Sequence, residues 1–153
     1  IGEYQHGEKH GQGTYIYNYG DKYVGGFKYG LRHGQGTHTH STGDKYIGDF
    51  ENDCRTGKGT YIWSNGDKYV GDFIDDESNG YGTFVWSDGD DCIGEFKNGM
   101  MHGQGTYTFD YGDTYKGGFK NGLRNGQGTY TYADGTIKKG FWNNNLRLLT
   151  LNE

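Results

Sequence analysis

Glycine recurs every 23 residues along this chain, and no other feature constrains the fold as strongly. Five glycine series share this period, and they include all of the 31 glycines except Gly26 and Gly118. The clearest series comprises Gly20, Gly43, Gly66, Gly89, Gly112 and Gly135. In the fifth series, Asp53, Asp76 and Asn145 interrupt the glycines. A fixed period of roughly 20–50 residues predicts a repeat protein, in which each repeat packs mainly against its neighbours.

Each repeat contains two segments in which aromatic residues alternate with small, polar or β-branched ones. Residues 46–50 read Y-I-G-D-F, and residues 59–63 read G-T-Y-I-W. This period of two predicts half-buried β-strands. The sequence S-N-G-D at 64–67 predicts a tight hairpin turn, whereas the connection at 97–103 is expected to be longer and polar. No segment has helical periodicity, so we expect an antiparallel meander with two strands per repeat.

Side-chain alternation assigns the aromatic rings to one face of the sheet. Tyr46 and Phe50 share a face with Gly48, and Tyr61 shares a face with Gly59. A ring can lie over a glycine because no Cβ obstructs it, so a single sheet can bury its rings against itself. We therefore expect an all-β fold, an elongated single-layer antiparallel β-sheet that forms a solenoid or trough of about six and a half hairpin repeats.

The repeats set the predicted domain boundaries. We expect one array over residues 1–142, followed at 143–153 by a C-terminal cap or the start of a further segment. The predicted repeats are 1–22, 23–45, 46–68, 69–91, 92–114, 115–137 and a partial repeat at 138–142. The chain begins without Met and partway through a repeat, so the natural N-terminus is expected upstream. The leucine-rich stretch 146–151 is expected to cover the edge of the last hairpin.

Composition and charge argue against several classes of protein. A formal charge of −5 argues against nucleic acid binding, which selects basic surfaces. No apolar run reaches membrane-spanning length. Disordered chains are poor in aromatic residues, whereas Tyr, Phe and Trp make up 17% of this chain. Cys54 and Cys92 form neither a disulfide framework nor a metal-ligand spacing, which favours free thiols and a reducing compartment.

The consensus Y-x-G-x-F…G-x-G-x-Y-x-Y…G-D resembles the Membrane Occupation and Recognition Nexus (MORN) repeat over nearly the whole chain. This resemblance implies a cytoplasmic scaffold that holds protein partners, is often associated with the cytoskeleton or with membranes, and sometimes dimerises. Lipid binding is often attached to the family, and relatives carry such repeats beside lipid-kinase or lysine-methyltransferase domains. The chain departs from the consensus at His38 and His40, which replace both second-strand aromatics of one repeat. It also departs at Cys92 and Lys138, which replace leading tyrosines.

The aromatic face has two interpretations. Its rings can form the core of the sheet, or some can stay exposed as the floor of a groove that binds a protein segment, since Tyr and Trp anchor interfaces. Trp63 and Trp86, the largest and most central rings, are predicted to contribute most to partner contact. The predicted groove residues are Tyr46, Phe50, Tyr61, Trp63, Tyr69, Phe73, Phe84, Trp86, Phe96 and Tyr107.

Charge is unevenly distributed between the repeats. Repeat 69–91 contains seven acidic residues and no Lys or Arg: Asp72, Asp75, Asp76, Glu77, Asp88, Asp90 and Asp91. These residues form either a solvated acidic loop or a docking patch for a basic partner segment. A calcium site at 75–77 is the third alternative, although no recognisable calcium loop frames it.

A modest basic group lies toward the C-terminus: Lys116, Lys120, Arg124, Lys138 and Lys139. Its ligands would be anionic lipid headgroups, each basic residue contributing about 1 kcal/mol near a membrane surface. The acidic repeat opposes this attraction. We therefore expect phosphoinositide binding to be weak and membrane association to be indirect.

No group of residues predicts catalysis, a cofactor or a metal ion. His10, His33 and His102 recur in H-G-Q-G loops that are too far apart to share a zinc ion. His38 and His40 lie on one face but lack further ligands, so we interpret them as filling aromatic positions. The G-x-G elements do not open a helix and are not phosphate loops. The regular G-D aspartates are interpreted as turn residues that accept backbone N–H groups.

The sequence therefore predicts a non-enzymatic scaffold that binds a peptide or helix along an aromatic β-sheet groove, with a homodimer as one arrangement. Two alternatives remain open. One is the regulatory or targeting module of a larger enzyme, of the lipid-kinase or lysine-methyltransferase type. The other is a secreted carbohydrate-binding repeat, a class that also uses short aromatic hairpins.

Overall fold

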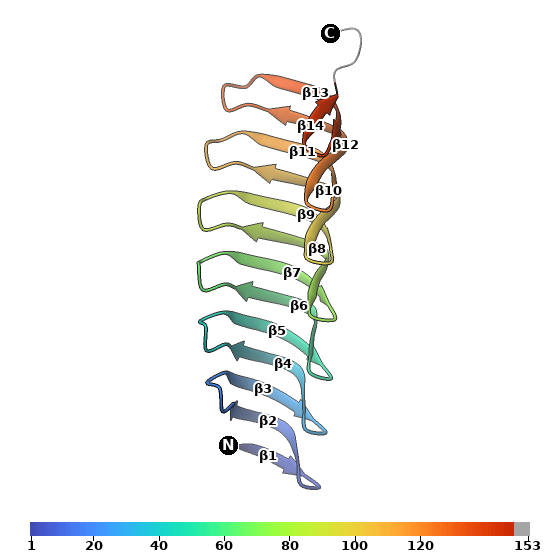
Figure 1. Cartoon of the computed structure of the whole chain (residues 1–153). Coiled ribbons are helices and arrows are strands. Elements are labelled where there is room, and N and C mark those ends of the chain that lie inside the picture. Colours follow the sequence, from blue (N-terminus) through green and yellow to red (C-terminus); the bar gives the residue numbers. More distant parts are fainter. Residues whose placement is uncertain (149–153) are drawn as a thin grey trace. The chain divides into compact units, whose positions relative to one another are not determined.

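A computed structural model describes residues 1–148, which form fourteen β-strands and no helix (Figure 1). The chain divides into two compact units, unit 1 (residues 1–77) and unit 2 (from residue 78 onward). The strands up to the boundary are β1 (Gly2–Gln5), β2 (Glu8–Ile16), β3 (Lys22–Lys28), β4 (Leu31–Thr39), β5 (Lys45–Glu51), β6 (Cys54–Ile62) and β7 (Lys68–Ile74). The remaining strands are β8 (Glu77–Val85), β9 (Asp91–Lys97), β10 (Met100–Thr108), β11 (Thr114–Lys120), β12 (Leu123–Thr131), β13 (Ile137–Asn143) and β14 (Leu146–Leu148). No described segment is a helix that could cross a membrane.

Within each unit the strands pair in sequence order, and each pair is antiparallel. Each repeat supplies an odd-numbered strand, which carries the Y-x-G-x-F segment, and the even-numbered strand that follows it. The structure thus confirms the all-β hairpin-repeat fold that the glycine spacing predicts.

Cross-strand register brings rings and glycines to the same face, as the side-chain alternation predicts. Tyr46 on β5 lies opposite Tyr61 on β6, and Gly48 lies opposite Gly59. The ring of Tyr46 lies directly over Gly59, where a Cβ would come within 3.0 Å of two ring carbons and the hydroxyl oxygen. The expectation that rings lie over glycine gaps is therefore confirmed.

The rings of the odd-numbered strands form the core, and we call them the core row. Tyr23 packs edge-to-face against both Phe27 and Phe50, with 5.1 Å between ring centroids in each pair. Tyr115 in unit 2 packs in the same way against Trp142, at 5.1 Å. This geometry sets the positive ring edge against the negative ring face and adds to the hydrophobic contribution of burial. The buried hydrophobic residues are Tyr23, Phe27, Tyr46, Phe50, Tyr69, Phe73, Cys92, Phe96, Met101, Tyr115, Phe119 and Trp142.

The core changes in repeat 92–114, where a cysteine replaces the leading tyrosine. Cys92 is fully buried, and the end of Met101 lies over Gly105, where the missing tyrosine ring would otherwise be. Methionine is flexible enough to fill such a gap. Burial raises the pKa of the Cys92 thiol to about 12, so this group is a core residue rather than a reactive thiolate.

One predicted connection is wrong. The segment 97–103, expected to be a long polar loop, contains only a two-residue turn, because β9 ends at Lys97 and β10 begins at Met100. Asn98 and Gly99 have φ of 50° and 78°, the positive values of a type I′ hairpin turn. The start of β10 does not alternate regularly because the register shifts between Met101 and Gly105.

The two glycines outside the 23-residue series lie at register shifts in β3 and β11. A Cβ on Gly26 would come within 3.0 Å of the carbonyl oxygen of His33, and one on Gly118 would meet the carbonyl oxygen of Asn125 in the same way. These positions require glycine because the paired backbone approaches closely.

The last described hairpin pairs β13 with β14. Asn143 lies opposite Leu146, and an Arg147 Nη donates to the Lys139 carbonyl at 2.8 Å. This pairing is compatible with the predicted cap at 143–153, which stays a prediction. Its residues 149–153 lie outside the described residues.

Candidate functional site

A second row of rings lies at the ends of the even-numbered strands. In unit 2 it is continuous, and we call it the outer row: Phe84, Trp86, Tyr107, Phe109, Tyr130 and Tyr132. Successive ring centroids in this order lie 4.4, 5.3, 4.7, 5.9 and 4.8 Å apart. All six rings are half-buried, unlike the buried rings of the core row. The outer row therefore keeps aromatic surface that a partner can cover.

Turn aspartates hold the tyrosines of the outer row. Asp90 accepts the Tyr107 hydroxyl with one oxygen and the backbone N–H of Asp110 with the other. The Tyr130 hydroxyl donates to Asp113 at 2.6 Å. Burial, followed by these carboxylates, raises the pKa of both Tyr107 and Tyr130. The predicted turn role of the G-D aspartates is confirmed, and they have a second role in fixing the ring edges.

In unit 1 the corresponding row has histidines in its middle. Tyr61 and Trp63 form one pair, with ring centroids 4.5 Å apart. Tyr17 lies 6.0 Å from the ring of His38, which in turn lies 4.2 Å from the ring of His40. Unit 2 thus carries the longer run of purely aromatic rings.

The predicted groove residues divide into two groups of five. One group is buried at 0–6% exposure and belongs to the core row: Tyr46, Phe50, Tyr69, Phe73 and Phe96. The other group is half-buried: Tyr61, Trp63, Phe84, Trp86 and Tyr107. Only the second group offers surface to a partner, and it includes both tryptophans for which we predict the largest contribution to partner contact.

The acidic residues of repeat 69–91 belong to different units. In unit 1, Asp72 pairs with a lysine Nζ of β6 at 2.6 Å and Asp76 pairs with an arginine of β6, while Asp75 and Glu77 are exposed. This pairing leaves 75–77 without the convergent carboxylates that a calcium site requires.

In unit 2, Asp88 is exposed, whereas Asp90 and Asp91 are half-buried. Since Asp90 already binds Tyr107, Asp88 is the acidic group of this trio that is most accessible to a basic partner. Docking of a basic partner on the acidic residues therefore stays a prediction, and it now concerns only the exposed ones.

The basic group divides between the two faces of unit 2. Lys116 and Lys139 both lie opposite Thr129, on the face away from the rings, and border a shallow depression with Gln104. Lys138 lies opposite Tyr130 on the aromatic face, with its Nζ 5.0 Å from a ring centroid. This division weakens the case for a single lipid-binding surface.

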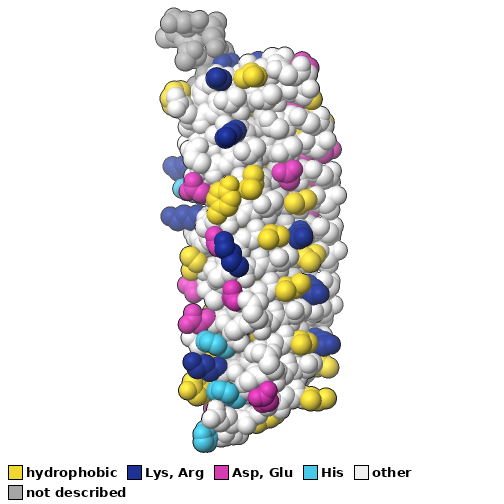
Figure 2. Space-filling model, turned by 180° about the vertical axis from the view of Figure 1, so that it is seen from behind, with side chains coloured by type: hydrophobic (Ala, Val, Ile, Leu, Met, Phe, Trp, Pro, Cys, Tyr) yellow, Lys and Arg dark blue, Asp and Glu magenta, His cyan; other side chains and the backbone are white. Residues whose placement is uncertain are grey.

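Figure 2 shows the molecule from behind, where hydrophobic side chains appear as separate spots among polar ones. On the face away from the rings, Val24, Ile47 and Val70 in unit 1 alternate with threonines and are 40–44% exposed. Single exposed aliphatic residues of this kind are ordinary on soluble proteins and indicate no binding site.

The expectation that His38 and His40 lack further ligands is wrong. Asp21 Oδ2 lies 3.1 Å from His38 Nε2 and 3.0 Å from His40 Nδ1. The G-D pattern places Asp21 in a turn and does not connect it with the histidines 17 and 19 residues later. The spacing is the signal that could have found this contact. Asp44 and Tyr61, at the same separation of 17 residues, also bind each other.

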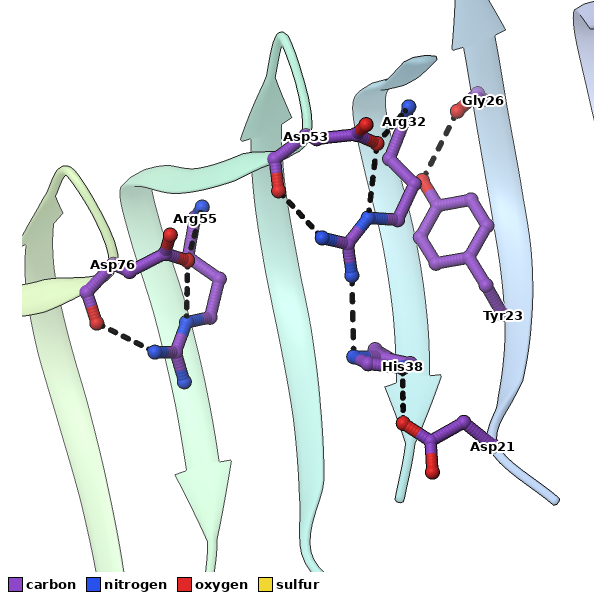
Figure 3. Close-up of polar contacts among 8 residues, drawn as sticks. All are labelled: Asp21, Tyr23, Gly26, Arg32, His38, Asp53, Arg55 and Asp76. Atoms are coloured by element: carbon purple, nitrogen blue, oxygen red, sulfur yellow. Dashed lines mark hydrogen bonds and ion pairs between the residues drawn. The ribbon is translucent and has the colours of Figure 1, made fainter. Parts of the chain in front are cut away.

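An arginine clip between consecutive hairpins is a second feature that the sequence pattern did not predict (Figure 3). Arg32 donates from its backbone N and Nε to Asp53 Oδ1 at 2.7 and 3.2 Å, and from an Nη to the Asp53 carbonyl at 2.6 Å. Arg55 binds Asp76 through the same three donors, and Arg124 binds Asn145. The acceptors are the residues that interrupt the fifth glycine series.

The clip adds a side chain to a backbone contact that repeats without it also make. The N–H of Asp53 donates to the Arg32 carbonyl at 3.1 Å, and the N–H of Gly122 donates to the Met101 carbonyl at 2.9 Å. Arg32 also lies 4.9 Å from the ring centroid of Phe50, so the guanidinium covers the core row.

Replacing Arg55 with methionine, the residue at the same repeat position in 92–114, should lower the free energy of unfolding by about 1–2 kcal/mol, because Asp76 loses a charge-assisted partner. Adding Asp76→Gly should restore about half of this loss. Asp76 has φ of 70°, which glycine adopts without strain, and the pair then matches Met101 and Gly122. Urea unfolding of both variants tests this, and equal stability of the two would contradict it.

Both a protein family and solved structures are similar to this chain. A family model described as MORN repeat matches residues 1–22, 23–45, 46–68, 69–91, 92–114 and 115–137. No curated protein matches the sequence significantly.

Among solved structures, the chain is similar to the SAS-4 (dCPAP) TCP domain of Drosophila melanogaster in complex with a proline-rich motif of Ana2 (dSTIL). The TM-score is 0.54 at 12% identity, over 86% of this chain and 73% of that chain. The TCP10c domain of Drosophila melanogaster Sas-4 is also similar, with a TM-score of 0.50 at 13% identity, over 86% of this chain and 79% of that chain. At these identities the similarity concerns the fold.

Proposed function

The chain belongs to the MORN repeat family, and we propose that it is a non-enzymatic scaffold that binds an extended protein segment on the outer row of unit 2. The observation that carries this proposal is the difference between the two rows of rings. The core row is buried and stabilises the sheet, whereas the outer row keeps six adjoining rings half-exposed. Aromatic rings in a continuous, partly exposed row are typical of surfaces that anchor a partner.

The segment we favour is proline-rich. A proline-rich chain already holds the extended polyproline II conformation, loses little entropy on binding, and docks on surfaces lined with aromatic rings. The similar SAS-4 domain is in complex with a proline-rich motif, which supports this choice of ligand.

The charge around the outer row favours basic residues in the same segment. Asp88, Asp110 and Asp134 are exposed in the turns that follow the rings of β8, β10 and β12. Carboxylates beside an aromatic surface raise the association rate of a cationic partner and discriminate against an anionic one. The free thiols Cys54 and Cys92 support a reducing, cytoplasmic location for this scaffold.

Trp86→Ala should weaken the binding of a proline-rich, basic peptide by at least about tenfold, because a half-buried tryptophan in an interface is a typical hot spot. The melting temperature should change little, since Trp86 lies outside the core row. Peptide arrays select the probe and calorimetry measures its affinity. Trp63→Ala tests in the same way whether unit 1 contributes.

The matched control is Ile93→Thr, which changes an exposed side chain on the opposite face of unit 2. This variant should bind the peptide as the unmodified protein does. If Trp86→Ala instead lowers the melting temperature and leaves affinity unchanged, the outer row is structural and the proposal fails. Equal binding of acidic or proline-free peptides would contradict the choice of ligand.

A further inference from the structure

Repeat 23–45 differs from the others where its even-numbered strand meets the preceding turn. In three other repeats a tyrosine hydroxyl donates to the turn aspartate 17 residues earlier: Tyr61 to Asp44, Tyr107 to Asp90 and Tyr130 to Asp113. His38 takes the tyrosine position here, and His40 takes the position of the next ring. One histidine would suffice to replace the tyrosine, so the second calls for a further explanation.

We propose that Asp21, His38 and His40 form a binding site for a divalent transition metal ion, with Zn²⁺ as the best fit. One potential ligand atom of each residue lies within 4.8 Å of the others, and no other described residues form such a group. Two imidazoles and one carboxylate are a common ligand set for zinc. This site is independent of the outer row in unit 2.

The distances suit a shared ion. Zinc bonds near 2.0–2.2 Å in tetrahedral geometry place neighbouring ligand atoms roughly 3.3 Å apart. Asp21 Oδ2 lies 3.1 Å from His38 Nε2 and 3.0 Å from His40 Nδ1. All three potential ligand atoms lie within 4.8 Å of one another, so the two rings must move closer together to share one ion.

The orientation of His38 also supports a metal site. Its Nε2 is buried and lies 3.1 Å from Asp21 Oδ2 (Figure 3), but this contact lacks the alignment of a good hydrogen bond. The nitrogen is thus close to the oxygen without pointing at it. Two ligands that both point at one metal ion would have this arrangement. A buried, unsatisfied ring nitrogen is unfavourable, and coordination would satisfy it.

The carboxylate is already held for this role. Asp21 Oδ1 accepts the backbone N–H of Ser41 at 2.9 Å, which leaves Oδ2 to the histidines. The His40 side chain is 34% exposed, so the fourth position opens to water.

Arg32 is the contact that opposes metal binding. Its Nη1 lies 3.2 Å from His38 Nδ1, and a guanidinium only donates, so the ring proton is on Nε2 (Figure 3). Coordination through Nε2 moves this proton to Nδ1, and Arg32 must give up the bond. Asp53 still holds Arg32 at three other atoms, so the clip survives.

The test is calorimetric titration of the untagged full chain with Zn²⁺, together with the visible absorption of bound Co²⁺, which reports tetrahedral coordination. We expect one ion per chain and a rise in melting temperature with zinc. His38→Tyr and His40→Phe introduce residues that other repeats carry at the same positions, so both variants should fold. Each should weaken zinc binding by at least about 100-fold, since outer-shell changes alone cost about 10–100-fold.

The control His102→Asn removes a histidine far along the sequence and should bind zinc as the unmodified chain does. Arg32→Met removes the opposing donor and should tighten binding. Zinc affinity that is unchanged in His38→Tyr or His40→Phe, or that is absent from the unmodified chain, would overturn the proposal. Weaker binding in Arg32→Met would overturn the assigned geometry.

Discussion

Gly36→Ala is expected to lower the free energy of unfolding by about 3 kcal/mol or more, the upper range for overpacking a core. The new Cβ would lie within 3.0 Å of three atoms of the Tyr23 ring, Oη included. That ring cannot move away, because it is fully buried between Phe27 and Phe50 and its hydroxyl donates to the Gly26 carbonyl at 3.0 Å. Alanine itself suits the backbone here, because φ of Gly36 is not positive, so the clash with the ring is the main expected cause of the loss.

The same repeat position offers matched controls. Gly105 lies under Met101, whose flexible end can shift, so Gly105→Ala should cost about 1 kcal/mol. Gly13 belongs to the first repeat, which lacks the leading tyrosine, and a Cβ there meets nothing closer than 3.3 Å. Gly13→Ala should therefore be nearly neutral. Urea unfolding followed by circular dichroism measures all three, and equal losses would show that the ring over the glycine is not the cause.

Raising the pH should unfold the protein cooperatively between about pH 10 and pH 12. Burial raises the pKa of Tyr23 from 10.0 to about 12, and burial likewise raises the pKa of Tyr46, Tyr115 and Tyr130. A tyrosine whose folded pKa exceeds its unfolded pKa favours folding less as the pH rises from the unfolded value toward the folded one. Each unit of pKa contributes about 1.4 kcal/mol, so several buried tyrosines together approach the 5–15 kcal/mol that is typical of total stability.

Tyrosinate absorbance and circular dichroism, measured on the same samples, test this expectation. The absorbance of the buried tyrosines should rise together with the loss of β-structure. Tyr23→Phe removes one ionisable hydroxyl. After allowing for any change in its stability at pH 7, this variant should unfold at a higher alkaline pH than the unmodified protein. If all tyrosines titrate before the β-structure changes, burial does not control their ionisation.

The fold could be predicted because the residues that determine it act locally. The alternation in 46–50 and 59–63 fixes strands and faces, and the glycines fix where rings can lie. The start of β10 could not be predicted from alternation, because a register shift between Met101 and Gly105 removes it. The N-G pair at 98–99 was the better signal, since it is typical of a two-residue hairpin turn.

The candidate sites were less predictable because they depend on contacts between repeats. Sequence parity places Phe50 and Trp63 on one face but does not show that only Trp63 keeps exposed surface. The clip joins Arg32 to a residue 21 positions later, across a repeat boundary, where neither residue breaks a strand pattern. Asp21 did not stand out because five of the six turns of this kind carry an aspartate, Thr136 being the exception.

The arginine clip restricts which repeats can follow one another in the array. An arginine in one hairpin needs an aspartate or asparagine in the next, so a repeat is not freely interchangeable with its neighbours. Loss of residues 46–68 during gene rearrangement would leave Arg32 facing Asp76, and the pair would survive. Loss of 69–91 would instead set Arg55 against Gly99, which has no side chain to accept it. Deletions of single repeats would therefore differ in their cost to stability, according to which two repeats they join.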